Sequence, residues 1–198
     1  MEKTEIDPRP LIYPCPTLIV GATIDNKANF MTAAWNGIAC GNPPMISVAI
    51  RHQRYTLVGI KQNMSFSINI PSEDLVKETD YCGLVSGSKA DKAEACKFNI
   101  FYGKLENAPL IEQCPINLGC KVEHILNLGS HALVIGRVEE TYVSNNGLTD
   151  GKPDISKMHL FSYITRPGMS KGNPAGEYRA VGEVVGNAYS IGRELEGK

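Results

Sequence analysis

The amino-acid sequence predicts a mainly β protein with short helices, whose strands form a closed or nearly closed barrel. Apolar side chains occupy most even positions from Ile116 to Leu128, and a Gly129-Ser130 pair then leads into a second long segment, 131–143. A period of two is typical of a β-strand, and a two-residue loop closes an antiparallel hairpin. Two strands of this length, together with at least four earlier ones, indicate a barrel.

Four shorter segments supply the earlier strands. They are rich in β-branched and apolar residues. Three of them cover 17–23, 45–50 and 65–70, and the other, second in the chain, begins with 28–37. Asp25-Asn26-Lys27 predicts a turn between the first two, and Asn42-Pro43-Pro44 is expected to end the second. Residues 65–70 alternate between polar and apolar side chains, which predicts a strand with one buried face.

Three segments favour short helices. Residues 55–63 predict a helix with Thr56 as candidate N-cap. Ser72 is expected to cap a helix over 73–82, because Glu73 and Asp74 then lie at its positive end. A further short helix is expected within 89–98.

Composition restricts the possible classes of function. With 198 residues, of which 42% are hydrophobic, the chain is expected to form one domain over 1–198. The net charge is −1 without a basic stripe, which argues against nucleic acid as a partner. No window of 18 apolar residues occurs, and MEKTEIDPRP does not resemble a secretory signal, so we expect a cytoplasmic protein without a membrane span.

Six cysteines are present, and we expect free thiols in a reducing compartment: Cys15, Cys40, Cys82, Cys96, Cys114 and Cys120. No CxxC motif occurs, so no metal site is expected. From about residue 166 the chain is glycine-rich, with seven glycines in its last 33 residues, yet it keeps apolar side chains such as Val184 and Tyr189. We interpret this segment as an extended tail that packs on another surface.

Three segments carry residues suited to ligand binding. In NFMTAAWNG, residues 29–37, the small side chains leave the backbone open to the edge of a heteroaromatic ring, which Trp35 or Asn36 would bound. In RHQRYT, residues 51–56, Arg51, Arg54 and the Thr56 hydroxyl at a helix N-terminus form a candidate phosphate cradle. In VSGSKADK, residues 85–92, the Ser-Gly-Ser backbone with Lys89 or Lys92 could hold an anion.

Each segment also has a plain structural explanation: a closely packed strand with Trp35 in the core, a solvated basic turn, and an ordinary loop entering a helix. Taken together, however, the three segments suit a single ligand with a flat ring and a phosphate tail.

The order of these motifs resembles the flavin reductase-like family, and most closely its flavoredoxin branch. The resemblance rests on NFMTAAWNGIACGNPPMISVAIRHQRYT, FSINIPSEDLVKETDYCGLVSG and LGSHALVIGRVEE, and it extends from about Pro14 to GEVVGNAYSIGREL near the end. The resemblance implies an FMN-binding split β-barrel and a homodimer.

It also implies roles for matched positions. The cofactor-binding residues would be Met31, Thr32, Ala33, Ala34, Trp35, Asn36, Val48, Ala49, Ile50, Arg51, Arg54, Tyr55, Thr56, Ser86, Gly87, Lys89 and Lys92. His131 would lie near the flavin or nicotinamide face as the candidate catalytic residue, with a surface histidine at the hairpin end as the alternative. His124, on the apolar face of its strand, is expected to be a core or interface histidine.

Two functions follow from the resemblance, and a third from the cysteines. The first is a flavoredoxin-like protein that keeps its FMN and passes electrons to a redox protein partner. The second is an NAD(P)H-dependent flavin reductase that uses FMN as an exchangeable substrate. The third is a cysteine-rich redox or metal protein in which Cys40 relays electrons as a thiol.

Overall fold

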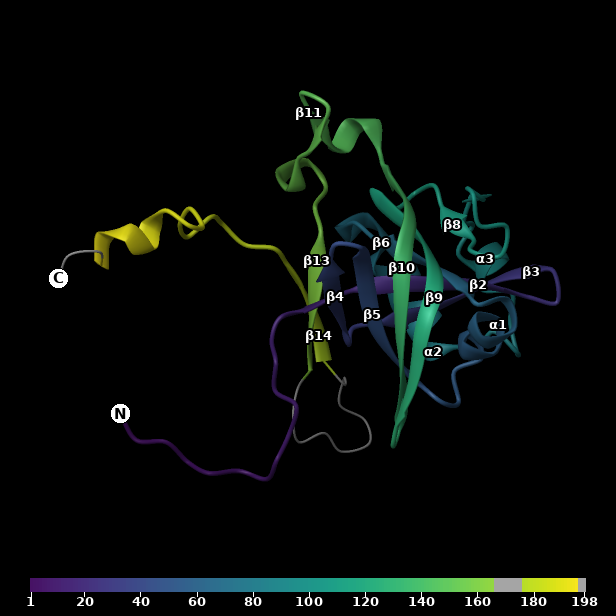
Figure 1. The fold of residues 1–198 in the computed structure, drawn as a ribbon, viewed down its shortest axis with the longest axis horizontal. Coiled ribbons are helices and arrows are strands. Elements are labelled where there is room, and N and C mark those ends of the chain that lie inside the picture. The colour runs from purple at the N-terminus through teal and green to yellow at the C-terminus, as the bar shows by residue number, and fades with distance from the viewer. Residues whose placement is uncertain (166–175, 196–198) are drawn as a thin grey trace.

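The structure is a computed structural model, and it describes residues 1–165 and 176–195. A seven-stranded antiparallel sheet dominates it, in the order β3-β2-β6-β9-β10-β5-β4 (Figure 1). Its strands are β2 Leu18–Ile24, β3 Lys27–Ala33, β4 Asn36–Gly41, β5 Pro44–Arg51, β6 Ser65–Ile70, β9 Ile116–Leu128 and β10 His131–Val143. The long hairpin of β9 and β10 around Gly129-Ser130 is thus confirmed.

The sheet curls toward closure, so that the edge strand β3 contacts β5 next to the opposite edge. The edge strands β3 and β4 are consecutive in the chain, and the backbone N–H of Ala49 in β5 donates to the carbonyl of Trp35, just before β4, at 2.8 Å. Fully buried Val20, Ile50 and Phe66 belong to the apolar cluster inside. The prediction of a mainly β, nearly closed barrel is therefore confirmed.

Helices and smaller strand pairs cover the outside. The helices are α1 Thr56–Asn63, η1 Glu73–Leu75, α2 Val76–Leu84, α3 Lys92–Ala95, η2 Asn145–Gly147, η3 Ile155–Lys157 and η4 Ile191–Leu195. The short pairs are β7 Ile100–Phe101 with β8 Leu110–Ile111, and β11 Leu148–Thr149 with β12 Lys152–Pro153. Beneath α2 and α3 a second apolar cluster forms, in which Phe30 and Phe98 meet edge to face at 5.7 Å.

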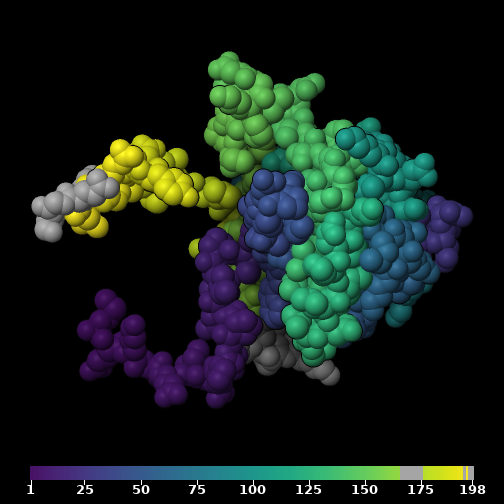
Figure 2. Space-filling view, viewed as in Figure 1, coloured from purple at the N-terminus to yellow at the C-terminus, as the bar shows by residue number. Residues whose placement is uncertain are grey.

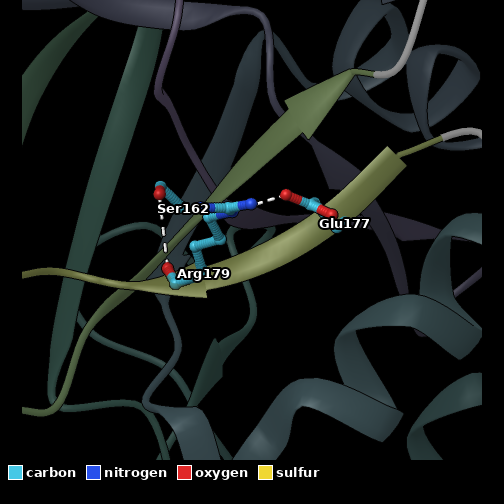
Figure 3. Close-up of polar contacts among 3 residues, drawn as sticks. All are labelled: Ser162, Glu177 and Arg179. Atoms are coloured by element: carbon cyan, nitrogen blue, oxygen red, sulfur yellow. Dashed lines mark hydrogen bonds and ion pairs between the residues drawn. The ribbon is translucent and has the colours of Figure 1, made fainter.

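A separate three-stranded sheet lies beside the barrel. It consists of β1 Cys15–Pro16, β13 Phe161–Thr165 and β14 Gly176–Ala180, in the order β1-β13-β14. The Ser162 hydroxyl of β13 donates to the Arg179 carbonyl of β14 at 3.3 Å, and within β14 Arg179 pairs with Glu177 at 2.5 Å (Figure 3).

Two strand predictions were wrong in detail. The strand expected to begin at 28–37 is divided, because β3 ends at Ala33 and β4 begins at Asn36 on the opposite edge of the sheet. The strand over 65–70 has no exposed face. Its polar side chains are buried beneath residues 107–111, where the Ser67 hydroxyl donates to Pro109 O and Asn69 Oδ1 accepts from Ile111 N at 2.8 Å.

The helix caps also differ from expectation. Thr56 is the first helical residue and does not cap, because its hydroxyl accepts a hydrogen bond from Asn29 Nδ2 at 2.6 Å. Ser72 makes no side-chain cap, and the expected helix 73–82 divides into η1 and α2. Within 89–98 only α3 is helical, and the Asp91 side chain caps it.

His124 is exposed, so its placement in the core was wrong. The pairing of β9 with β10 shifts by one residue between Ile135 and Gly136, and this bulge changes which side chains face inward. Leu126 and Leu128, on the same nominal face, are 47% and 55% exposed. A role for His124 in an interface stays a prediction.

The N-terminal residues before β1 and the segment 181–195 extend away from the barrel (Figures 1 and 2). The expected tail pairs with β13 over Gly176–Ala180, but beyond it Val184, Val185 and Tyr189 are 86–99% exposed. Residues 166–175 and 196–198 of the predicted tail lie outside the described residues.

All six cysteines are free, as predicted. In the described ranges, every helix is too short or too polar to cross a bilayer.

Candidate functional site

A cavity of about 530 Å³ lies where the turn after β5, the end of α2 and the 85–92 loop come together. Most of the residues predicted for the phosphate end of a ligand meet there. The lining residues are Met31, Arg51, Gln53, Arg54, Tyr55, Thr56, Leu84, Ser86, Gly87, Lys92 and Tyr163. Among the described residues, three cations and no carboxylate line this cavity, which we call the cationic cavity.

Two of these cations are held by the C-terminal end of α2. Arg54 Nη1 donates to the Gly83 carbonyl at 2.6 Å, and Lys92 Nζ donates to the Cys82 carbonyl at 2.9 Å. Lys92 is only 4% exposed, and within 1–165 and 176–195 neither cation forms an ion pair with a carboxylate. Burial lowers the pKa of both groups, and Arg51 adds to the effect on Arg54. A bound anion would relieve this unbalanced charge.

The 85–92 loop lies directly against β3. A Cβ atom on Gly87 would overlap Oδ1 of Asn29, the same side chain that donates to the Thr56 hydroxyl. Only glycine fits this approach of loop and strand without displacing Asn29. Next to it, the hydroxyls of Ser86 and Ser88 are hydrogen bonded to each other at 2.9 Å.

A second cavity of about 380 Å³ continues from the first, and we call it the ring-side cavity. It shares Arg54, Leu84 and Tyr163 with the cationic cavity. Its lining residues are Thr17, Thr32, Ala34, Arg54, Asp80, Gly83, Leu84, Tyr163, Gly176 and Tyr178. Thr32 and Ala34, the small residues predicted to admit a ring, both line this cavity, and the Thr32 hydroxyl donates to the Thr79 carbonyl of α2.

Lys89 lies apart from both cavities. It lines a third, polar cavity of about 400 Å³, together with Lys27 and Asp91. That cavity shares Tyr55, Gly87 and Lys92 with the cationic cavity.

Several predicted residues line none of these three cavities. Ala33, Val48 and Ile50 are buried in the barrel core. Asn36 donates to the Pro16 carbonyl at 2.9 Å, and Ala49 donates to Trp35 through its backbone. Their assignment to cofactor binding stays a prediction.

Trp35 and His131 also line none of the three cavities, and their rings stack on each other at the surface. Their ring centroids lie 4.8 Å apart at 25°, and Trp35 is 43% exposed, so the alternative that placed Trp35 in the core was wrong. His131 pairs with Arg51 across β10 and β5, and its Nδ1 lies 2.8 Å from the Ser130 hydroxyl. Burial, Arg51 and His52 lower the pKa of His131, which favours the neutral ring at pH 7.

Sequence reasoning missed three lining residues of the ring-side cavity. Asp80 is in α2, just before the 85–92 segment, whereas Tyr163 and Tyr178 come from β13 and β14. No local motif marks the two tyrosines, because the small sheet brings them to α2 from more than 80 residues along the chain.

The cationic cavity and the ring-side cavity join beside a nearly closed barrel. This arrangement suits a planar ligand with an anionic tail. The comparisons with known proteins agree with this class. The model of the flavin reductase like domain matches residues 11–159, and the chain therefore belongs to the flavin reductase-like family, with its split-barrel fold.

Within this family the chain is similar to two flavoredoxins of known structure. It is 38% identical to the flavoredoxin of Methanosarcina acetivorans, with a TM-score of 0.90 over 98% of this chain and 100% of that one. It is 34% identical to the flavoredoxin of Desulfovibrio vulgaris (Miyazaki F), with a TM-score of 0.84 over 96% of this chain and 100% of that one. An uncharacterized protein of Archaeoglobus fulgidus is 32% identical over 145 residues, which cover 73% of this chain and 81% of that one. The chain belongs to the flavoredoxin branch.

Proposed function

We propose that this protein binds FMN across the cationic and ring-side cavities and transfers electrons through it, as a flavoredoxin-like redox protein. The observation that carries the proposal is the cationic cavity. Arg51, Arg54 and Lys92 line it without a carboxylate from the described part of the chain, and it adjoins a cavity edged by the small residues Thr32 and Ala34. A doubly charged phosphate fits the first, and a flat ring fits the second.

Each part of the site then has a task. The Arg54 and Lys92 cations, already oriented by the α2 carbonyls, would hold the phosphate, and Ser86 would add a hydroxyl. Ala34 and the Thr32 hydroxyl, which is tied to α2, would leave room for the ring. Bound flavin supplies the electron-transfer chemistry, while the protein supplies position and electrostatics.

A second candidate is an NAD(P)H-dependent flavin reductase that exchanges FMN as a substrate. The exposed stack of Trp35 and His131 next to Arg51 favours it, because a flat, partly cationic surface suits a nicotinamide nucleotide. In this case His131 would act at the nicotinamide face, as a neutral ring.

One anaerobic titration tests both candidates. The visible spectrum of the purified protein with FMN is recorded before and after NADH or NADPH, and again after dithionite. Rapid bleaching by a nicotinamide supports the reductase. A spectrum that persists until dithionite is added supports the electron carrier. If apoprotein does not bind FMN, as followed by flavin fluorescence, the proposed site is wrong.

A further inference from the structure

A carboxylate lies at the ring-side cavity, opposite in charge to the cations of the neighbouring one. Asp80 of α2 is half-buried there, and Oδ1 of its carboxylate accepts a hydrogen bond from the Tyr178 hydroxyl of β14 at 2.9 Å. The two residues are 98 positions apart in the chain. The contact therefore joins the small sheet to α2 at the cavity wall.

No cation neutralises this carboxylate within the described part of the chain. Arg54 lines the same cavity, but its guanidinium donates to the Gly83 carbonyl and forms no ion pair with Asp80. Thr17 also lines this cavity, and its own hydroxyl is buried without a hydrogen-bond partner among the described residues. The ring-side cavity thus offers the negative charge of Asp80 to whatever occupies it.

Tyr178 is held firmly as a donor. Its ring packs edge to face on Phe161 at 5.5 Å and lies 5.7 Å from that of Tyr163. Burial and the nearby Asp80 raise the pKa of Tyr178 well above its usual value, so its hydroxyl keeps its proton. β14 itself pairs with β13 along all five of its residues.

We propose that the Asp80–Tyr178 pair sets the charge at the ring end of the flavin site and thereby holds the reduction potential of bound flavin low. The inference rests on the proposed function. Reduction adds negative charge to the ring, and a carboxylate in the same partly enclosed cavity raises the free energy of that reduced form. Asp80 acts directly on the ring, whereas Tyr178 is a positioning residue that also offsets part of the carboxylate charge.

Two conservative variants test the pair, because they are expected to shift the reduction potential of bound FMN in opposite directions. Asp80→Asn keeps an oxygen for the Tyr178 hydroxyl but removes the charge. It is expected to strengthen binding of reduced over oxidised FMN about tenfold, which raises the two-electron midpoint potential by about 30 mV. Tyr178→Phe removes the donor and leaves the charge, so it is expected to lower the potential. The potentials are measured anaerobically by equilibration with a reference dye.

Two control variants separate the effect of the Asp80 charge on the potential from a general disturbance of the fold. Asp74→Asn removes an exposed charge just before α2, and Tyr189→Phe removes a fully exposed hydroxyl. Both are expected to leave the potential unchanged. Thermal melting of each apoprotein and titration with oxidised FMN show whether the fold and the site persist.

The outcomes are distinct. Opposite shifts in the two variants with unchanged controls support the pair. Equal potentials in all variants, or shifts of the same sign in both, would overturn it while FMN binding in the two cavities still stands. Wild-type protein that fails to bind FMN would overturn the proposed function and this inference together.

Discussion

Arg54 and Lys92 each make a structural hydrogen bond and also line the cavity that we propose to bind phosphate. Each donates to a carbonyl in the last turn of α2, where the helix dipole favours positive charge. Each also lines the cationic cavity, in which no carboxylate of residues 1–165 or 176–195 competes for it. This arrangement keeps two cations oriented before any anion arrives, which reduces the entropy lost on binding.

Replacing Arg54 should weaken binding of FMN through its phosphate. Arg54→Ala removes a charge-assisted hydrogen bond, which corresponds to a loss of about 1.5–3 kcal/mol in binding free energy. Fluorescence titration of the apoprotein measures this loss. Riboflavin, which lacks the phosphate, is the control ligand, and its affinity should change little. An unchanged affinity for FMN would contradict the assignment of Arg54.

Replacing Gly87 should disturb the contact between loop and strand. In Gly87→Ala the added methyl group overlaps the Asn29 side chain, so Asn29 must move away from Thr56. Overpacking of this kind costs about 1–3 kcal/mol in free energy of unfolding. Urea denaturation measures it, with Gly37→Ala as control, because a Cβ at Gly37 meets no atom within 4 Å. Equal losses in both variants would show that the close approach does not matter.

At the scale of elements, Glu140 ties the 103–105 segment to β10. Its carboxylate accepts hydrogen bonds from Lys104 N at 2.7 Å, Leu105 N at 3.3 Å and the Tyr142 hydroxyl at 2.8 Å. Burial acts to raise the pKa of Glu140, but these hydrogen bonds outweigh it and hold the pKa below its ordinary value. The ionised form therefore stabilises the fold.

This hydrogen bonding predicts a stability difference that depends on pH. Glu140→Gln should lower the free energy of unfolding by about 2 kcal/mol at pH 7. Because the folded pKa is depressed, the stabilisation is present above the unfolded pKa, about 4.3, and is lost as the pH falls through the folded pKa. Denaturation at pH 7 and near pH 3 measures the difference between the two proteins. A difference that stays constant or grows in acid would contradict the role of the charge.

At the scale of the whole molecule, the arm of residues 181–195 has no surface to cover in a single chain. Val184, Val185 and Tyr189 are among its exposed apolar side chains, and the arm points away from the barrel (Figure 2). Exposed apolar groups in such a segment favour association. We expect the arm to pack on a second copy of the chain.

Light scattering tests this expectation. The full chain should have twice the monomer mass of 21.6 kDa, and a chain that ends at Ala180 should have the monomer mass. Urea denaturation of the shortened chain serves as the control for folding. A monomer mass for the full chain would contradict the dimer.

The candidate site could be predicted only in part. The 51–56 and 85–92 segments each carry their cations or glycine within a few residues, so their role at the cationic cavity was visible as a local motif. Asp80 and Tyr178 could not be found in this way, because their contact exists only where the small sheet meets α2. Trp35 and His131 were both predicted, but their mutual stacking was not.

The period-two strands, the Gly129-Ser130 hairpin and the basic turn at 51–56 could be predicted from the sequence, because backbone conformation and turn chemistry depend on neighbouring residues. Long-range packing places β3 and β4 on opposite edges, buries both faces of β6 and turns His124 outward. Such features depend on contacts between segments far apart in the chain. A one-residue shift in strand pairing changes which side chains face the core, and local periodicity carries no information about it.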